Sequence, residues 1–157
     1  MMKKLLFAGL LAIFSFSPSF GQNSFNIGGH VGIPVGDIQD VSSFEAGLDL
    51  AYRFAFVDIV EVGPLVGYTH FFGENDAEDF NYIPIAASGR LGLPSSFFVG
   101  FDIGYAIALK DQADGGLFYR PQLGYNFMNV GIVLSYAGIA EDNIDLGALT
   151  LGVEFKL

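Results

Sequence analysis

The stretch "FFVGFDIGYAIAL" (residues 97–109) alternates between two kinds of side chain. Its odd-numbered positions are all large and apolar, whereas its even-numbered positions include Gly100, Asp102 and Gly104. Successive side chains of a β-strand point to opposite faces, so the period is two. The alternation therefore predicts a strand with one apolar face and one face that carries small or charged residues.

A membrane-spanning helix does not explain the same stretch. Residues 97–109 would reach only about 20 Å as a helix, less than the ~30 Å hydrocarbon core of a bilayer. As a strand tilted by about 40°, they would rise roughly 33 Å. After residue 21, no run of 18 or more uninterrupted apolar residues occurs. Any crossing of a membrane by this part of the chain is therefore predicted to use strands.

The same alternation recurs along the chain, which gives eight predicted strands in all. The other seven cover residues 25–33, 44–54, 60–72, 82–91, 119–127, 130–136 and 149–157. Four connections are longer and acidic, namely residues 34–43, 73–80, 110–116 and 138–145. Three are short, near residues 56–58, 92–96 and 128–129. Alternation of long and short connections predicts an antiparallel, up-and-down meander whose two ends face different compartments.

Composition separates a membrane barrel from a soluble one. Hydrophobic residues make up 52% of the chain and charged residues 15%, against about 25% charged in a typical soluble domain. In a lipocalin-like soluble barrel the polar face would meet water and carry many charges. Here that face is mostly Gly, Ala, Ser and Asn, which suits a narrow lumen. The predicted fold is an all-β, eight-stranded, antiparallel, up-and-down transmembrane β-barrel.

The N-terminal segment has the features of a cleaved signal peptide. Lys3 and Lys4 precede an apolar run of 12 residues (5–16), and the small residues Ser19 and Gly21 precede Gln22. We expect cleavage after residue 21, which leaves residues 22–157 as the barrel; a membrane anchor is the alternative. This part of the chain has five basic and 17 acidic residues, a net charge of −12, and the whole chain lacks cysteine. Nucleic acid is therefore not expected as a partner.

The charged residues fall into two groups. Strand parity predicts that one group lines the lumen, where opposite charges must pair because a narrow barrel excludes water. This lumen group comprises Glu45, Asp49, Arg53, Glu61, Arg90, Asp102, Arg120, Glu154 and Lys156. The second group lies in the four longer connections and comprises Asp37, Asp40, Glu74, Asp76, Glu78, Asp79, Asp111, Asp114, Glu141, Asp142 and Asp145.

Several segments resemble the small porin-family, OmpA/OmpX-like outer-membrane β-barrel proteins of Gram-negative bacteria. They are "GIPVGD" (32–37), "GPLVGYTHFFG" (63–73), "YIPIAASGR" (82–90), "FFVGFDIGYAIAL" (97–109), "YRPQLGY" (119–125) and "LGVEFKL" (151–157). The resemblance covers the barrel segment and implies a location in the outer membrane, with both termini in the periplasm and the acidic loops outside. It also implies that the final strand is read by the barrel-assembly machinery, although the last residue is Leu157 and not Phe.

The sequence supports no catalytic or metal site. The chain has two histidines and no G-x-S-x-G motif. A lipid-modifying enzyme would need a nucleophile and a base at the membrane rim. His70 lies near the outer end of its predicted strand, but parity places it on the lipid-facing side, and His30 lies on the luminal side. The acidic run "ENDAED" (74–79) lacks the spacing of an EF-hand loop. No enzyme activity and no cofactor are therefore predicted.

The functional prediction is an integral outer-membrane protein with a structural or surface-interaction role. Its expected partners are outer-membrane lipid and lipopolysaccharide, whose phosphates could be bridged to the acidic loops by divalent cations, and the assembly machinery; a monomer is expected. Two alternatives stay open at this point. One is a narrow pore for ions or small solutes, which an eight-stranded barrel disfavours because side chains fill it. The other is a lipid-modifying enzyme.

Overall fold

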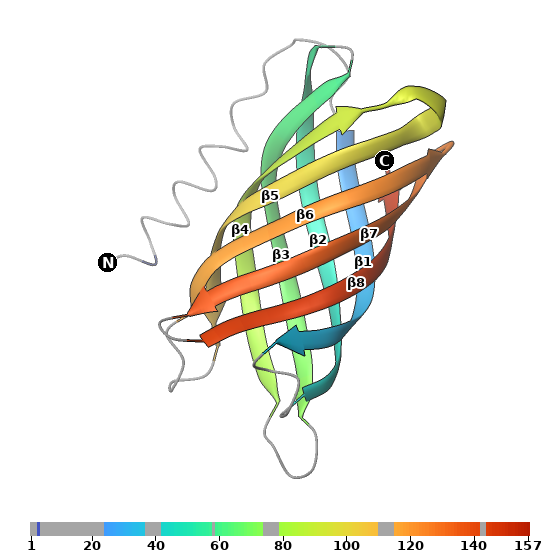
Figure 1. The fold of residues 1–157 in the computed structure, drawn as a ribbon. Helices are drawn as coiled ribbons and strands as arrows, with labels where there is room; N and C mark the ends of the chain where they lie inside the picture. The colour runs from blue at the N-terminus through green and yellow to red at the C-terminus, as the bar shows by residue number, and fades with distance from the viewer. Residues whose placement is uncertain are drawn as a thin grey trace.

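The computed structural model contains eight long β-strands (Figure 1). The structure describes residues 24–36, 42–57, 59–73, 79–109, 115–141 and 144–157, together with Lys3. The strands are β1 (Ser24–Gly36), β2 (Ser42–Val57), β3 (Val60–Gly73), β4 (Phe80–Gly92), β5 (Phe97–Ala108), β6 (Gly116–Phe127), β7 (Val130–Glu141) and β8 (Ile144–Lys156). The predicted leader, residues 1–21, lies outside the described residues apart from Lys3.

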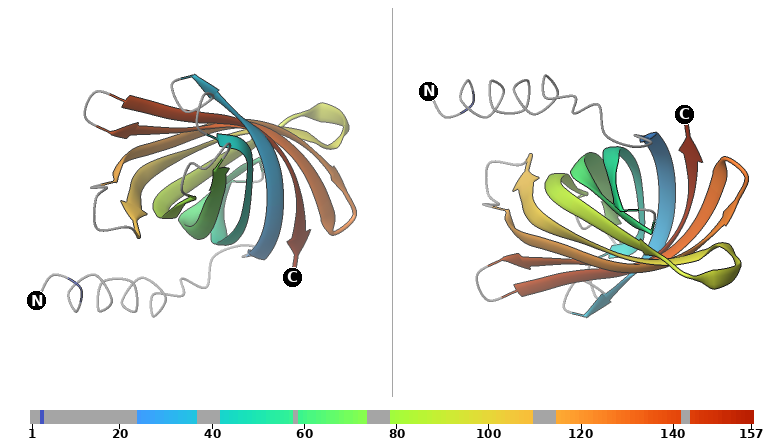
Figure 2. Two further views of the ribbon diagram at one scale, coloured as in Figure 1. Left: turned by 90° about the horizontal axis from the view of Figure 1, so that it is seen from below. Right: turned by 90° about the horizontal axis from the view of Figure 1, so that it is seen from above.

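The eight strands form one closed antiparallel barrel. Each strand pairs with the next in sequence, and β1 closes the ring against β8, as the end-on views in Figure 2 show. Closure leaves no strand with an unpaired edge, which is the condition for burying backbone N–H and C=O groups in hydrocarbon. The predicted fold class and up-and-down order are confirmed.

The two ends of the barrel differ in their connections (Figure 1). At one end, here called the turn end, β2–β3, β4–β5 and β6–β7 are joined by short connections, and the chain enters β1 and leaves β8. At the other end, the loop end, lie the connections 37–41, 74–79, 109–115 and 142–143. The first three of these connections are longer than those of the turn end, as the sequence predicts, but the fourth, 142–143, is as short as a turn-end connection.

One predicted connection is wrong. Residues 138–145 were expected to form the fourth acidic loop, but β7 continues to Glu141 and β8 begins at Ile144. Glu141 pairs with Ile144, and Ala140 pairs with Asp145. The acidic composition suggested a loop, yet the alternation persists, because Ile139 points into the barrel and is only 4% exposed. The last two strands are therefore longer at the loop end than predicted.

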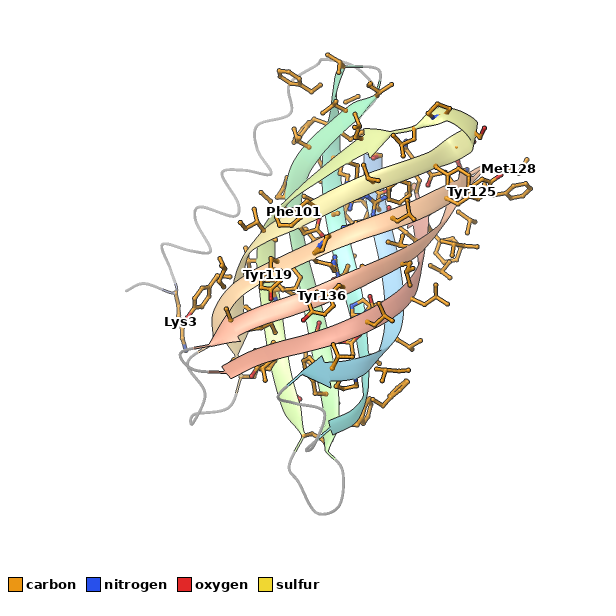
Figure 3. The ribbon with its side chains drawn as sticks, viewed as in Figure 1. Lys3, Phe101, Tyr119, Tyr125, Met128 and Tyr136 are labelled. Carbon is orange, nitrogen blue, oxygen red and sulfur yellow. The ribbon has the colours of Figure 1, made fainter. Side chains whose placement is uncertain are left out.

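The outer surface of the barrel is apolar. Among the described residues, the exposed large hydrophobic side chains outnumber the buried ones. Phe101, Ile103 and Tyr105, three of the odd-numbered residues of β5, are 47–49% exposed, and Figure 3 shows Phe101 on the outside of the ribbon. An apolar surface of this extent is far larger than a soluble monomer exposes and matches a lipid environment.

Aromatic side chains gather toward both ends of this surface. At the turn end, Phe97 and Tyr125 pack edge to face with ring centroids 5.0 Å apart, and Figure 3 shows Tyr125 beside Met128. Toward the loop end, Tyr119 lies beside Tyr136, with ring centroids 6.4 Å apart (Figure 3). Two aromatic zones that flank an aliphatic band are typical of outer-membrane barrels.

The interior contains an apolar cluster that the sequence analysis did not assign. It fills the half of the barrel nearer the loop end, and its members are at most 8% exposed. They are Ala51, Leu65, Phe71, Tyr82, Ala86, Ala106, Phe118, Ile139, Leu146 and Ala148. The interior is therefore closed by hydrophobic packing on one side and lined by polar groups on the other.

In the part of the chain that the structure describes, no helix is long and apolar enough to span a bilayer.

Close contact between β4 and β5 gives the first prediction. A Cβ atom added at Gly104 would lie 2.0 Å from the carbonyl oxygen of Ile85 and 2.5 Å from the Cα of Ala86. Both are backbone atoms that cannot move aside, so Gly104→Ala is expected to destabilise the folded barrel by about 1–3 kcal/mol. The measurement is the urea midpoint of unfolding in lipid vesicles.

Gly89→Ala on the neighbouring strand is the matched control. There the nearest atoms, the carbonyl oxygen of Phe101 and Cγ1 of Val62, lie 3.9 Å from the added Cβ, so the midpoint should stay within error of the parent. Equal urea midpoints for the two variants would contradict the close backbone contact between β4 and β5 at Gly104.

Candidate functional site: the charged barrel interior

The candidate site is the set of charged and polar side chains inside the barrel. All nine residues that parity assigned to the lumen lie on the interior-facing side of their strands. They come from six strands, β2, β3, β4, β5, β6 and β8, which surround one interior because the barrel closes. Eight of them form two groups of ion pairs and a third pair at the mouth, and the ninth, Glu45, is paired with His30. These contacts are called the interior network below.

Glu154 of β8 is the centre of the first group. Its carboxylate accepts hydrogen bonds from both terminal nitrogens of Arg90, each at 2.7 Å, in a bidentate arrangement. Arg53 Nη1 donates to the same carboxylate at 3.1 Å and Arg53 Nε donates to Ser88 at 3.1 Å. Two cations thus share one carboxylate, and the Phe98 ring lies 4.3 Å from Cζ of Arg90.

Arg120 of β6 is the centre of the second group. Its Nε donates to Asp102 at 2.9 Å, and its Nη1 donates to Asp49 at 3.0 Å. Gln122 donates from its side-chain amide to the same Asp102 oxygen at 2.8 Å. Asp102 is fully buried, so the charge in the middle of the opening stretch is neutralised by the neighbouring strand, where Arg120 is its register partner.

His30 joins the network next to Asp49, although the sequence analysis noted only its luminal face. Its Nδ1 lies 2.9 Å from Glu45 Oε1, and its Nε2 lies 3.4 Å from Asp49 Oδ2. Glu45 is fully buried, and His30 is 9% exposed. The count of interior charges is the sequence signal that points to this role of His30. Five interior carboxylates face four cationic side chains, so one carboxylate needs a further partner.

The pair nearest the turn end differs from the others. Lys156 Nζ lies 3.5 Å from Glu61 Oε1, and the two side chains are 45% and 29% exposed. A solvated pair of this kind contributes little to stability. The ion pairs inside the barrel are thus buried, whereas the Lys156–Glu61 pair at the mouth is exposed to solvent.

The acidic connections are largely beyond what the structure describes. The residues outside the described range are Asp37, Asp40, Glu74, Asp76, Glu78, Asp111, Asp114 and Asp142. For Glu141 and Asp145 only the strand backbone is described. Asp79 is the exception with a described side chain.

Asp79 forms a hydrogen-bonded pair with His70 at the loop end of β3. Its Oδ2 lies 2.9 Å from His70 Nε2, and its Oδ1 accepts the backbone N–H of Gly73 at 2.7 Å. The hydroxyl of Tyr68 lies 3.3 Å from the other ring nitrogen of His70. Asp79 precedes β4, so these contacts tie the end of β3 to the start of β4.

The acidic and histidine groups of the described residues do not form a metal site, because no three of them come together in an arrangement that could hold an ion. The described charged groups of the interior pair with one another and form hydrogen bonds.

The fold and this interior define a class: an eight-stranded barrel with an apolar exterior and a paired polar lumen, the architecture of small transmembrane β-barrels. No family model and no curated protein sequence matches the chain. Solved structures do match, and they include small outer-membrane barrels.

Three of these structures are similar to this chain over most of its length. The attachment invasion locus protein Ail of Yersinia pestis is 20% identical, with a TM-score of 0.60, covering 86% of this chain and 97% of that one. The N-terminal barrel domain of OprF from Pseudomonas aeruginosa is 17% identical, with a TM-score of 0.56 and coverage of 88% and 100%. The outer-membrane enzyme PagL is 13% identical, with a TM-score of 0.62 and coverage of 84% and 99%. At these identities the likeness establishes the fold, which is shared by an enzyme and by proteins of other kinds.

The burial of Asp102 gives the second prediction. Asp102→Leu removes the carboxylate that Arg120 contacts at 2.8 Å and leaves Asp49 as its remaining partner. Breaking a buried pair strands a desolvated charge, so we expect a loss of about 3 kcal/mol in the free energy of unfolding. Urea titration of the barrel in lipid vesicles measures it.

Lys156→Gln is the comparison variant, because it breaks an ion pair that is exposed. Its expected cost is less than about 1 kcal/mol. If both variants unfold at the same urea concentration as the parent, the interior pair makes no net contribution and the account of the network fails.

Proposed function

We propose that this protein is an integral outer-membrane β-barrel with a structural and surface-interaction role. The observation that carries the proposal is the close packing of the interior between the turn-end mouth and the loop end. Arg53, Asp102, Ala106 and Ala148 are at most 1% exposed although they point toward the barrel axis. A barrel whose core is packed in this way acts through its outer surface and its connections.

Location in the outer membrane is part of the proposal. Its support is the apolar exterior, the likeness in fold to outer-membrane barrels, and the signal-peptide features of residues 1–21. In this arrangement the turn end, with both chain ends, faces the periplasm and the loop end faces outward. Insertion would use the β8 strand, whose alternating residues end in Phe155, Lys156 and Leu157.

The acidic loops supply the surface for interaction. The connections 37–41, 74–79 and 109–115 carry eight of the acidic residues, and their charge suits divalent cations that bridge to the phosphates of lipopolysaccharide. The barrel closes with its own strands, so a single copy satisfies its backbone, which favours a monomer.

The two alternatives receive less support. A pore for ions or small solutes needs a water-filled path, and the apolar cluster around Phe118 and Leu65 occupies the interior toward the loop end. A lipid-modifying enzyme would use His70 on the lipid-facing side. Both nitrogens of His70 have partners, and Asp79 also binds the Gly73 backbone, an arrangement that fits a structural role at the end of the hairpin.

The absence of cysteine from the sequence allows the proposal to be tested by site-specific labelling. Asp76→Cys places one thiol in the β3–β4 connection, and Asn129→Cys places one in the β6–β7 turn at the opposite end. In intact cells, a membrane-impermeant maleimide should label Asp76→Cys and leave Asn129→Cys unlabelled until the outer membrane is permeabilised.

Heat-dependent mobility on a detergent gel shows that each variant is folded. Labelling of Asn129→Cys but not Asp76→Cys in intact cells would reverse the proposed orientation. Labelling of neither, with the protein absent from the outer-membrane fraction, would refute the proposed location.

A further inference from the structure

The barrel contains a cavity at its turn end. It has a volume of about 650 Å³ and is bounded by the connections near Leu93, Pro94 and Met128. Ligand pockets in proteins are of this size, and the mouth of a β-barrel is one of the places where they occur. The floor is formed by Arg90 and Glu154 of the interior network.

The floor of the cavity consists of side chains that are already paired. Arg90 and Glu154 satisfy one another through two hydrogen bonds of 2.7 Å, and Gln122 accepts a third from Arg90 at 3.0 Å. The Nε of Arg90 is buried without a hydrogen-bond partner in the described structure. Arg53 Nη1 also donates to Glu154, at 3.1 Å, so the floor offers a ligand polar groups whose charges already have partners.

The wall carries a second pair that can open. Lys156 and Glu61 both line the cavity, and their charged atoms are 3.5 Å apart and partly solvated. A pair of this kind separates at small cost, which frees one ammonium and one carboxylate side by side. The side-chain amides of Asn126 and Asn129, both exposed, also line the cavity and can donate and accept hydrogen bonds as a peptide group does.

We propose that this cavity binds a short peptide with free termini. The peptide carboxylate would pair with Lys156, its ammonium with Glu61, and its amide groups with the two asparagines. The cavity has two acidic and two basic side chains in its lining, so a zwitterion matches it better than a ligand with a net charge. In the proposed orientation the cavity opens to the periplasm, but binding to the purified barrel does not depend on that orientation.

Met128 provides a reporter for the test. It lines the cavity and is 87% exposed, and it is the only methionine after residue 2. Protein labelled with [methyl-13C]methionine and folded in detergent micelles is titrated with tri-alanine, and the Met128 methyl resonance is followed. We expect a saturable shift with a dissociation constant in the millimolar range, about 1–10 mM, as befits a small ligand held by solvated charges.

Two comparisons test which groups bind. N-acetyl-tri-alanine amide, which lacks both charges, should bind at least about threefold more weakly than tri-alanine to the parent protein. Glu61→Gln and Lys156→Gln should each weaken the binding of tri-alanine by a similar factor. Glu78→Gln, which makes the same change of side chain in a loop-end connection, should leave the affinity unchanged.

The neutral peptide keeps the proposal testable even if a variant does not fold. A shift that fails to saturate, or equal affinity for the charged and the capped peptide, overturns it. Unchanged affinity in folded Glu61→Gln and Lys156→Gln, judged by heat-dependent gel mobility, overturns it as well. Correct surface labelling with no peptide binding would remove this inference and leave the proposed function intact.

Discussion

The structure depends on the pairing of charges that are shielded from water inside a narrow barrel. A buried ion costs several kcal/mol unless a partner of opposite charge and further hydrogen bonds compensate for lost water. Asp102 and Arg120 meet this condition across the β5–β6 ladder, and Arg53 and Arg90 meet it on Glu154 from two other strands. The Asp102–Arg120 pair joins adjacent strands, and the pairs on Glu154 join strands that are distant in sequence. All of these charges therefore have partners only when the barrel is closed in this register.

The same register fixes the outer surface. Because the side-chain period is two, a slip by one residue would turn Asp102 toward lipid and Phe101 toward the interior. Both changes would be costly, because Asp102 would lose its partner of opposite charge and Phe101 would lose its apolar contact with hydrocarbon. The paired interior and the apolar exterior therefore specify one register together. Close backbone approach at Gly104 adds a steric condition, since only a residue without Cβ fits there.

Much of the fold could be predicted because the alternation reports both faces of each strand at once. The eight strands, their order and the side to which Asp102 points all follow from parity. The end of β7 was missed because acidic residues near Glu141 resembled a loop, whereas pairing with Ile144 continued the ladder. An acidic composition indicates exposure to solvent, but it does not exclude a strand. A strand that extends beyond the apolar band can be exposed and still form its backbone hydrogen bonds with the neighbouring strand.

The sequence predicts which charged residues point into the interior, but it does not predict which of them pair with one another. Parity identifies the residues that point inward, yet the match of Glu154 with two arginines depends on the tilt of the strands, which brings together residues 64 and 101 positions apart in the chain. The apolar cluster was missed for a related reason. Phe71, Tyr82 and Phe118 follow the inward parity, but they lie among apolar neighbours on both faces near the strand ends, where alternation gives no contrast.

The central claim is that paired charges and apolar side chains fill the lumen, and conductance across a planar bilayer tests it most directly. The account predicts that the purified barrel gives no current steps above the background of the lipid alone. Reproducible ohmic steps that disappear in Phe118→Trp, which adds bulk inside the apolar cluster, would show a continuous aqueous path and contradict the account.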